Sequence, residues 1–300
     1  MDVTYALRRV GLVLARASQV LGEEPYYHEF LEGLERVLAP AGISVLVKVV
    51  TDRAAERATY ARWQQRSRVA GVILVDLAPD DDRVTLVAEL DLPAVVIGDP
   101  STAPGLSTVW TDDAGFARAA VGFLADLGHR TVGHVAGPMA FAHTQLRRRG
   151  FQTEAAARGL TLRTAEGDYS WQAGADAAGE LLAAGPDGVA GPDGVAGLTA
   201  IVFDNDLMAL GGLHAIEERG LHVPRDMSIV AWDDSALCQL AVPPLSAMSH
   251  DVEQIGELAA EAMLEAMARR GPRVYQAPHA SIMARSSTAK VSAGSDAAAS

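Results

Sequence analysis

The chain has 300 residues, of which 49% are hydrophobic, enough for one large or two medium domains with buried cores. Its formal net charge of −13 argues against direct binding to phosphate backbones, since nucleic-acid affinity comes mainly from lysine and arginine side chains. Cys238 is the only cysteine, which excludes an internal disulfide and a multi-cysteine zinc site and is consistent with a reducing compartment.

Neither a membrane span nor an export signal is present in the sequence. No stretch of about eighteen consecutive apolar residues occurs, and the first nine residues lack the charged, apolar and small-residue order of a secretory signal. We therefore expect a cytoplasmic protein with no membrane contact.

Short apolar runs rich in β-branched residues recur along the chain and predict strands. They occupy 10–14, 43–50, 71–75, 94–97, 131–135, 200–203 and 228–232. Because the runs are continuous, both faces of each strand should be covered by helices, as in parallel sheets. Seven such runs exceed what one small doubly wound sheet usually holds, so the pattern predicts two α/β sheets, each with its own crevice.

Three amphipathic helices are predicted between the strands. Their apolar stripes cover 116–127, 207–216 and 252–266, and the stripes stop before Gly128, Gly220 and Gly271 respectively. Asp112 and Asp113 are suited to cap the first of these helices. Each helix should pack one face on a sheet.

Two segments are predicted to lie outside the folded core. The hexapeptide at 185–190 is repeated at 191–196, and its glycine and proline content predicts a duplicated surface loop rather than a helix. The tail 291–300 consists largely of small and polar residues and is predicted to be disordered.

The usual signatures of nucleotide binding, hydrolysis and zinc catalysis are missing from the sequence. Asp80, Asp81 and Asp82 resemble a metal loop, but without further spaced ligands they are more typical of a solvated helix start. We therefore predict no catalytic residues, no metal and no cofactor.

Polar side chains collect where the predicted strands end. Asp76 and Asp99 follow two strands, and the groups 204–206 and 233–234 follow two others. Ligands of open α/β sheets bind at this edge, although a single aspartate or asparagine there often only caps the next helix. The three polar residues at 204–206 and the two at 233–234 are more side chains than one helix cap requires.

Aromatic residues accompany these polar groups: Tyr169, Trp171, Phe203 and Trp232. Carboxylates and amides that bond hydroxyl groups, together with aromatic faces that stack on apolar ring surfaces, are typical of a site for a polyhydroxylated ligand. The sequence thus favours a sugar.

Two further positions are candidates. Arg147, Arg148 and Arg149 are expected at the start of a helix, where positive charge opposes the helix dipole, so at least one should have an anionic or hydroxylated partner. For Arg148 and Arg149 a solvated basic turn is an equal alternative. His250 precedes a predicted helix, and both a hinge position and a simple cap remain open for it.

Taken in order and spacing, a series of motifs resembles the sensing core of LacI-type transcription regulators over about residues 9–289. The motifs are 107–113 with Gly115, 127–130, 134–138, 147–151, 204–211, 220–226, 232–234 and 243–245.

This resemblance implies a fold like that of type I periplasmic binding proteins: α/β, with two Rossmann-like lobes with parallel sheets joined by three crossovers, an effector between the lobes, and homodimers formed side by side. The implied lobes are 7–127 plus 251–278 and 128–250 plus 279–290. The crossovers are expected near 127–128, 250–251 and 278–279, and the dimer contact on helices such as 51–66.

The resemblance also assigns roles to single residues. Arg147 matches the arginine that anchors the effector, Asn205 and Asp233 match polar contacts to its hydroxyls, Tyr169 matches an aromatic wall, and His250 matches a polar hinge residue. Further candidates for effector binding are Arg16, Asp99 and Phe203. The contribution of Arg16 stays open, because the loop 16–24 is longer than in the family.

The family's helix-turn-helix head should precede the first strand, where only residues 1–9 stand. We therefore expect operator DNA to be reached only through a head that this chain does not carry. The leading hypothesis is an allosteric sensor of a mono- or disaccharide that controls DNA binding. The alternatives are a sugar-binding protein of a transport system, and an enzyme that uses Asp233 and Asp206 as an acid/base pair.

Overall fold

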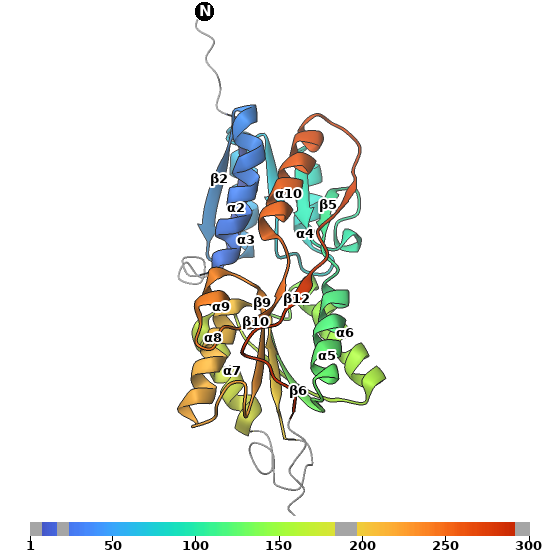
Figure 1. Cartoon of the computed structure of the whole chain (residues 1–300). Helices are drawn as coiled ribbons and strands as arrows, with labels where there is room; N and C mark the ends of the chain where they lie inside the picture. Colours follow the sequence, from blue (N-terminus) through green and yellow to red (C-terminus); the bar gives the residue numbers. More distant parts are fainter. Residues whose placement is uncertain (1–7, 17–23, 184–196, 292–300) are drawn as a thin grey trace, which may run out of the picture. The chain divides into compact units, whose positions relative to one another are not determined.

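The computed structural model describes residues 8–16, 24–183 and 197–291 (Figure 1). The described residues form two compact units. The first contains those up to 112, with 140–143 and 251–279, and the second contains 113–139, 144–250 and those from 280 on. The predicted duplicated loop and nearly all of the predicted disordered tail lie outside the described residues.

The first unit has one parallel sheet, in the order β11-β5-β4-β3-β1-β2. The strands are β1 (Arg8–Ala15), β2 (Ile43–Val50), β3 (Gly71–Leu74), β4 (Ala94–Ile97), β5 (Ser107–Trp110) and β11 (Val274–Gln276). Every pairing in this sheet is parallel, so all the strands end at the same edge.

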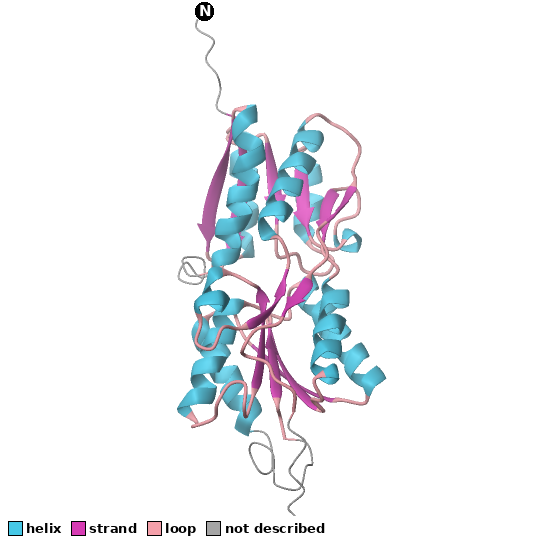
Figure 2. Cartoon of the chain, viewed as in Figure 1, coloured by secondary structure: helices cyan, strands magenta, loops and turns pink. Residues whose placement is uncertain are grey.

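Helices cover both faces of this sheet (Figure 2). They are α2 (Pro25–Leu38) and α10 (Val252–Met267) on one face, and α3 (Arg53–Gln65) and α4 (Asp82–Glu89) on the other, with short 3₁₀ turns η1 (Ala39–Ala41) and η2 (Pro100–Thr102). Leu12 and Leu14 point into the core under α2 and α10, whereas Val13 packs under α3 and α4. The period-two alternation of a strand thus fills both layers of the core.

The second unit repeats this architecture, in the order β12-β10-β9-β8-β6-β7. Its strands are β6 (Thr131–Ala136), β7 (Thr161–Glu166), β8 (Ala200–Phe203), β9 (Ser228–Asp233), β10 (Ser246–Ser249) and β12 (Ser281–Met283). Only β12, which is antiparallel to β10, departs from the parallel arrangement among the strands described here.

The helices of the second unit are α5 (Asp113–Asp126), α6 (Ala142–Arg158), α7 (Trp171–Ala183), α8 (Asp206–Glu218) and α9 (Ala236–Leu240). Phe116 and Leu124 of α5 share a core with Phe151 of α6 and Trp232 of β9. The helices α7 and α8 cross so closely that a Cβ on Gly211 would lie 2.0 Å from the carbonyl oxygen of Trp171. None of the described helices is long and apolar enough to cross a membrane.

The predicted architecture of two parallel α/β sheets is confirmed, and each of the seven predicted strands is present. The two compact units differ from the implied lobes at α5 and at 140–143. Residues 113–127 were assigned to the first lobe, with a crossover near 127–128, but α5 belongs to the second unit. The reason is packing, since the apolar stripe of α5 is buried against Val132 and Phe151 of the second unit.

Candidate functional site

The carboxyl edge of the second sheet brings together the polar groups that the sequence places after separate strands. β8 and β9 are parallel neighbours, so the segment 204–206 follows β8 at the edge where Asp233 ends β9. β10 is the next parallel strand, and His250 follows it directly. Residues far apart in the chain therefore share one edge of one sheet.

Arg147 lies near the middle of this group of residues. The helix α6 begins at Ala142, so Arg147 is in its second turn, and the predicted position at a helix start is wrong. Its Nε donates to Asp113 Oδ1 at 2.8 Å, and its Nη1 donates to the carbonyl oxygen of Asp204 at 3.1 Å. The guanidinium carbon lies 4.4 Å from the centroid of the Trp232 ring, within the range of a cation–π contact.

The charge of Arg147 is stabilised although the side chain is largely buried. Burial by itself lowers the pKa of this guanidinium, but Asp113 and Asp204 outweigh burial and raise the pKa further above its usual value. Arg147 therefore remains a cation, and the buried Asp113 depends on it. This pair gives Arg147 a structural role within the second unit.

Asp204 and Asn205 both form hydrogen bonds within the second unit. Asp204 accepts hydrogen bonds from the Gly137 N–H at 3.0 Å and pairs with His134 Nε2 at 2.9 Å. Burial raises the pKa of Asp204, but His134 outweighs this effect and holds the pKa below its usual value. Asn205 caps α8 by accepting from the Met208 N–H at 2.9 Å. The capping role that the sequence left open for Asn205 is therefore present.

The two aromatic candidates have different surroundings. Asn205 Nδ2 donates to the carbonyl oxygen of Tyr169 at 2.9 Å, and the Tyr169 hydroxyl lies 3.3 Å from Thr144 Oγ1. Phe203 is fully buried, and a Cβ on Gly212 would lie 2.1 Å from its ring. Phe203 thus packs β8 against α8, and its predicted contact with an effector is not supported.

Asp233 and His250 form a pair at the same edge. Asp233 Oδ1 lies 3.2 Å from His250 Nε2, and both side chains are mostly buried. Asp233 and Asp234 have φ of +70° and +64°, a left-handed conformation that non-glycine residues rarely adopt. Asp234 is paired with Arg285, so only Asp233 of this doublet is directed to His250.

In the first unit, Arg16 follows β1 and binds two carboxylates. Its Nε and Nη2 each donate to Asp76 at 2.9 Å, and its Nη1 donates to Glu24 at 2.9 Å. The guanidinium carbon also lies 5.4 Å from the centroid of the Tyr27 ring. Burial raises the pKa of Asp76, but Arg16 outweighs it and holds the pKa below its usual value.

Asp99, the other candidate of the first unit, is a cap. Its Oδ1 accepts from the Ser101 N–H at 2.8 Å and from the Ser101 hydroxyl at 2.6 Å. Asp81 is likewise bound, because Arg83 donates to it and also to the buried Glu56 at 2.6 Å. These contacts make 80–82 part of a structural network rather than a metal loop.

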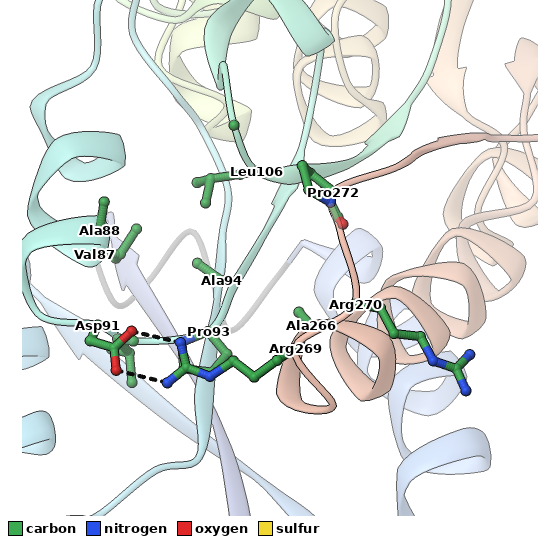
Figure 3. Close-up of a pocket in the computed structure, with 13 residues that line it drawn as sticks. Val87, Ala88, Asp91, Pro93, Ala94, Leu106, Ala266, Arg269, Arg270 and Pro272 are labelled. Carbon is green, nitrogen blue, oxygen red and sulfur yellow. Dashed lines mark hydrogen bonds and ion pairs between the residues drawn. The ribbon is translucent and has the colours of Figure 1, made fainter.

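Two cavities of the first unit lie at opposite edges of its sheet. One, of about 100 Å³, is lined at the carboxyl edge by Ala15, Asp76 and Arg53, among others. The other, of about 250 Å³, is lined at the amino edge by residues such as Leu106 and the Asp91–Arg269 ion pair (Figure 3). The candidate residues of this unit belong to the carboxyl edge.

Sequence reasoning missed several of these groups. His134 reads as part of an apolar strand, and Asp113 as a simple helix cap, although they are partners of Asp204 and Arg147. The ion pairs of Arg53 and Arg83 could not be predicted from the neighbouring sequence, because Asp81 and Glu56, their partners, come from other elements. In the described part of the chain, no group of three or more His, Cys, Asp or Glu side chains is placed to hold a metal ion.

Comparison with known proteins defines the class of this protein. The family model of a periplasmic binding protein-like domain matches residues 121–288. The crystal structure of a LacI family transcriptional regulator from Bifidobacterium animalis is 30% identical in sequence, with a TM-score of 0.83 over 95% of this chain and 99% of that one. The chain belongs to the LacI family of transcriptional regulators.

Two further relatives agree with this assignment. An HTH-type transcriptional regulator of Streptomyces limosus is 31% identical over 87% of this chain and 73% of its own length. The complex of the transcriptional regulator CelR with cellobiose is 26% identical, with a TM-score of 0.83 over 93% of this chain and 84% of that one. These relatives are regulators, and the resemblance found in the sequence motifs is confirmed.

Proposed function

We propose that the chain is the core of a transcription regulator that binds a mono- or disaccharide effector and thereby controls DNA binding. The observation that carries the proposal is the edge of the second sheet, where a buried guanidinium, a carboxylate in a left-handed conformation and an aromatic residue lie together. Carboxylates and guanidinium groups bond sugar hydroxyls, and CelR, a relative with the same fold, binds cellobiose.

The proposed contacts in the second unit are Arg147, Asn205, Asp233, Tyr169 and His250. The carboxyl edge of the first unit contributes Arg16 and Asp99. Arg16 is the stronger candidate of these two, because its guanidinium is a charged donor that lies beside the Tyr27 ring. Asp99 is occupied by Ser101 and would contribute through its remaining acceptor capacity.

The proposal includes three features of the regulator. It binds operator DNA through a helix-turn-helix head, it acts in the cytoplasm, and it forms a homodimer. Large apolar side chains that are exposed in both units support the dimer: Val47 and Val49 on the edge strand β2, and Leu240 and Val242 at and just beyond the end of α9. Isolated exposed apolar residues are ordinary, but pairs of them at neighbouring positions are typical of contact surfaces.

The enzyme hypothesis has less support. A general acid/base pair must reach a substrate, and Asp206 is buried and bonded to the backbone of Ser235. We therefore propose binding without turnover.

A thermal-shift screen against cellobiose, maltose, glucose and ribose tests this function. A sugar present at about one hundred times its Kd should stabilise the protein by about 2.7 kcal/mol, which raises the melting temperature by a few degrees. Chromatography of the incubated sugar should show it unchanged after a day. Conversion of the sugar would support the enzyme hypothesis, and the absence of binding by all of a wider set of mono- and disaccharides would contradict the proposed effector class.

A further inference from the structure

Asp206 is a buried carboxyl at the proposed site that no proposed effector contact uses. It is the first residue of α8 and is only 2% exposed. Its Oδ2 accepts a hydrogen bond from the Ser235 N–H at 2.8 Å. Its Oδ1 has no hydrogen-bond partner among the residues that the structure describes.

The basic side chains nearby are committed to other carboxylates. Arg147 is paired with Asp113, Arg285 with Asp234, and His250 with Asp233. Within the described ranges Asp206 forms no ion pair. An ionised carboxylate in this position would therefore be desolvated without a compensating positive charge, which is costly.

The groups that face Asp206 come from several segments. Asp233 ends β9 and Asp234 follows it, Ser235 caps α9, Cys238 belongs to α9, and Arg285 follows β12. Burial raises the pKa of Asp206 and the charge of Asp233 raises it further, against hydrogen bonds from Ser235 and Cys238, to about 7. Burial also raises the pKa of the Cys238 thiol, so this group stays neutral.

We propose that Asp206 is a positioning residue for the effector: its carboxyl group, buried without a cation, stays neutral and holds the turn from which Asp233 accepts an effector hydroxyl. This inference rests on the proposed function. Two adjacent carboxyl groups in a buried site do not both ionise readily, so their titrations belong to the pair. Asp206 holds the proton, because it is buried and no cation pairs with it among the residues that the structure describes.

The backbone connects this proton to the effector contact. Asp206 holds the N–H of Ser235, which follows the two left-handed residues Asp233 and Asp234. When Asp206 loses its proton, a buried negative charge without a cation appears beneath this turn and disfavours its conformation. Effector affinity is therefore highest below the pKa of Asp206 and falls as the pH rises through it.

Isothermal titration with cellobiose, maltose, glucose and ribose, between about pH 6 and about pH 8.5, tests the inference. For a sugar that binds, wild-type affinity should fall about five- to tenfold across this range, as expected for one coupled proton. Asp206→Asn keeps the shape of the side chain without its charge. Across the whole pH range, the affinity of this variant should stay within about twofold of the affinity that the wild type has at low pH. Asp126→Asn removes an exposed carboxylate of the same unit and should keep the wild-type slope.

A wild-type slope retained by Asp206→Asn, or a flat wild-type profile, would overturn the inference. If neither these four sugars nor a wider set of mono- and disaccharides binds at any pH, the proposed function fails and the positioning role fails with it. The free energy of unfolding of the unliganded protein distinguishes the two failures. If Asp206 holds a proton, the wild type loses stability relative to Asp206→Asn as the pH rises from about 4 to about 7. A constant stability difference over that range would show that Asp206 holds no such proton, which alone overturns the inference.

Discussion

The guanidinium of Arg147 stacks on the ring of Trp232, with the guanidinium carbon 4.4 Å from the ring centroid. Arg147 comes from α6 and Trp232 from β9, so the contact joins a helix to the centre of the sheet. The same guanidinium is bonded to Asp113 of α5. One side chain therefore combines a structural role in the second unit with a position at the proposed effector site.

Arg147→Ala is expected to impair both binding and folding. Loss of the charged contact should weaken effector affinity at least about tenfold, or about 1.4 kcal/mol. Because Asp113 would be left buried without its cation, the free energy of unfolding should also fall by about 3 kcal/mol. Calorimetric titration and urea unfolding measure the two effects.

A double variant separates these two roles of Arg147. Arg147→Met with Asp113→Asn removes both charges together, so it should regain much of the lost stability but none of the lost affinity. Arg148→Ala should change neither quantity. If the double variant binds the effector as tightly as the wild type, Arg147 is a purely structural residue.

The pH dependence of stability should report on His129. This side chain is buried, and its Nδ1 lies 2.8 Å from Thr199 Oγ1. Burial lowers the pKa of His129 to about 4. As the pH falls, the unfolded chain binds a proton at this histidine before the folded chain does. The contribution of neutral, buried His129 to the free energy of unfolding is therefore complete above about pH 6.5 and is lost as the pH falls toward about 4.

His129→Gln cannot titrate and should remove this part of the acid sensitivity, which is on the order of 1–2 kcal/mol. Urea unfolding of the variant and the wild type at matched pH values measures it. His222→Gln replaces an exposed histidine and serves as the control. If the free energies of unfolding of the wild type and His129→Gln differ by the same amount at neutral and at acidic pH, His129 does not have a lowered pKa.

The close crossing of α7 and α8 predicts a strong effect at Gly211. A Cβ there would lie 2.0 Å from the carbonyl oxygen of Trp171, so Gly211→Ala forces the helices apart. Overpacking of this kind costs about 1–3 kcal/mol. Gly271→Ala is the matched control, because a Cβ at Gly271 meets no atom within 4 Å. Equal melting temperatures of the two variants would show that the helices can separate without cost.

The proposed homodimer makes a prediction for the exposed residues at and just beyond the end of α9. Leu240 and Val242 are 79% and 84% exposed in the isolated chain. Replacing both with aspartate should turn a dimer into a monomer at micromolar concentration, as measured by sedimentation velocity, because charges at the centre of an apolar contact oppose association. Val274→Asp, at an exposed valine of the other unit, should leave the dimer intact. A monomeric wild type would remove the dimer from the proposed mechanism.

A run of apolar, β-branched residues predicted most of the strands, the edge strand β2 included, whereas the interior strand β5 was missed. The strands β3, β6 and β8 are buried along their whole length, and a continuous apolar run is the direct result of that burial. The edge strand β7 was missed because most of its residues are at least partly exposed, so it carries neither an apolar run nor a clean alternation. The three-residue strands β11 and β12 are too short for any periodic signal.

For the candidate site, the residue types and their place after strands were predictable, but their partners were not. Parallel strands end at one edge, so the sequence was sufficient to bring 204–206, 233–234 and His250 to the same part of the second unit. The assignment of α5 to the second unit could not be predicted, because an amphipathic stripe shows that a helix packs but not on which sheet.

The sequence by itself therefore determined the fold class, the family and the edge of the sheet where function should be sought, since these follow from local patterns of burial and from motif order. Only the tertiary structure decided what each polar side chain does. Asn205 is a cap, Phe203 is core, and Arg147 is tied to Asp113, because hydrogen bonds and ion pairs join residues from separate elements at distances of about 3 Å that no local pattern specifies.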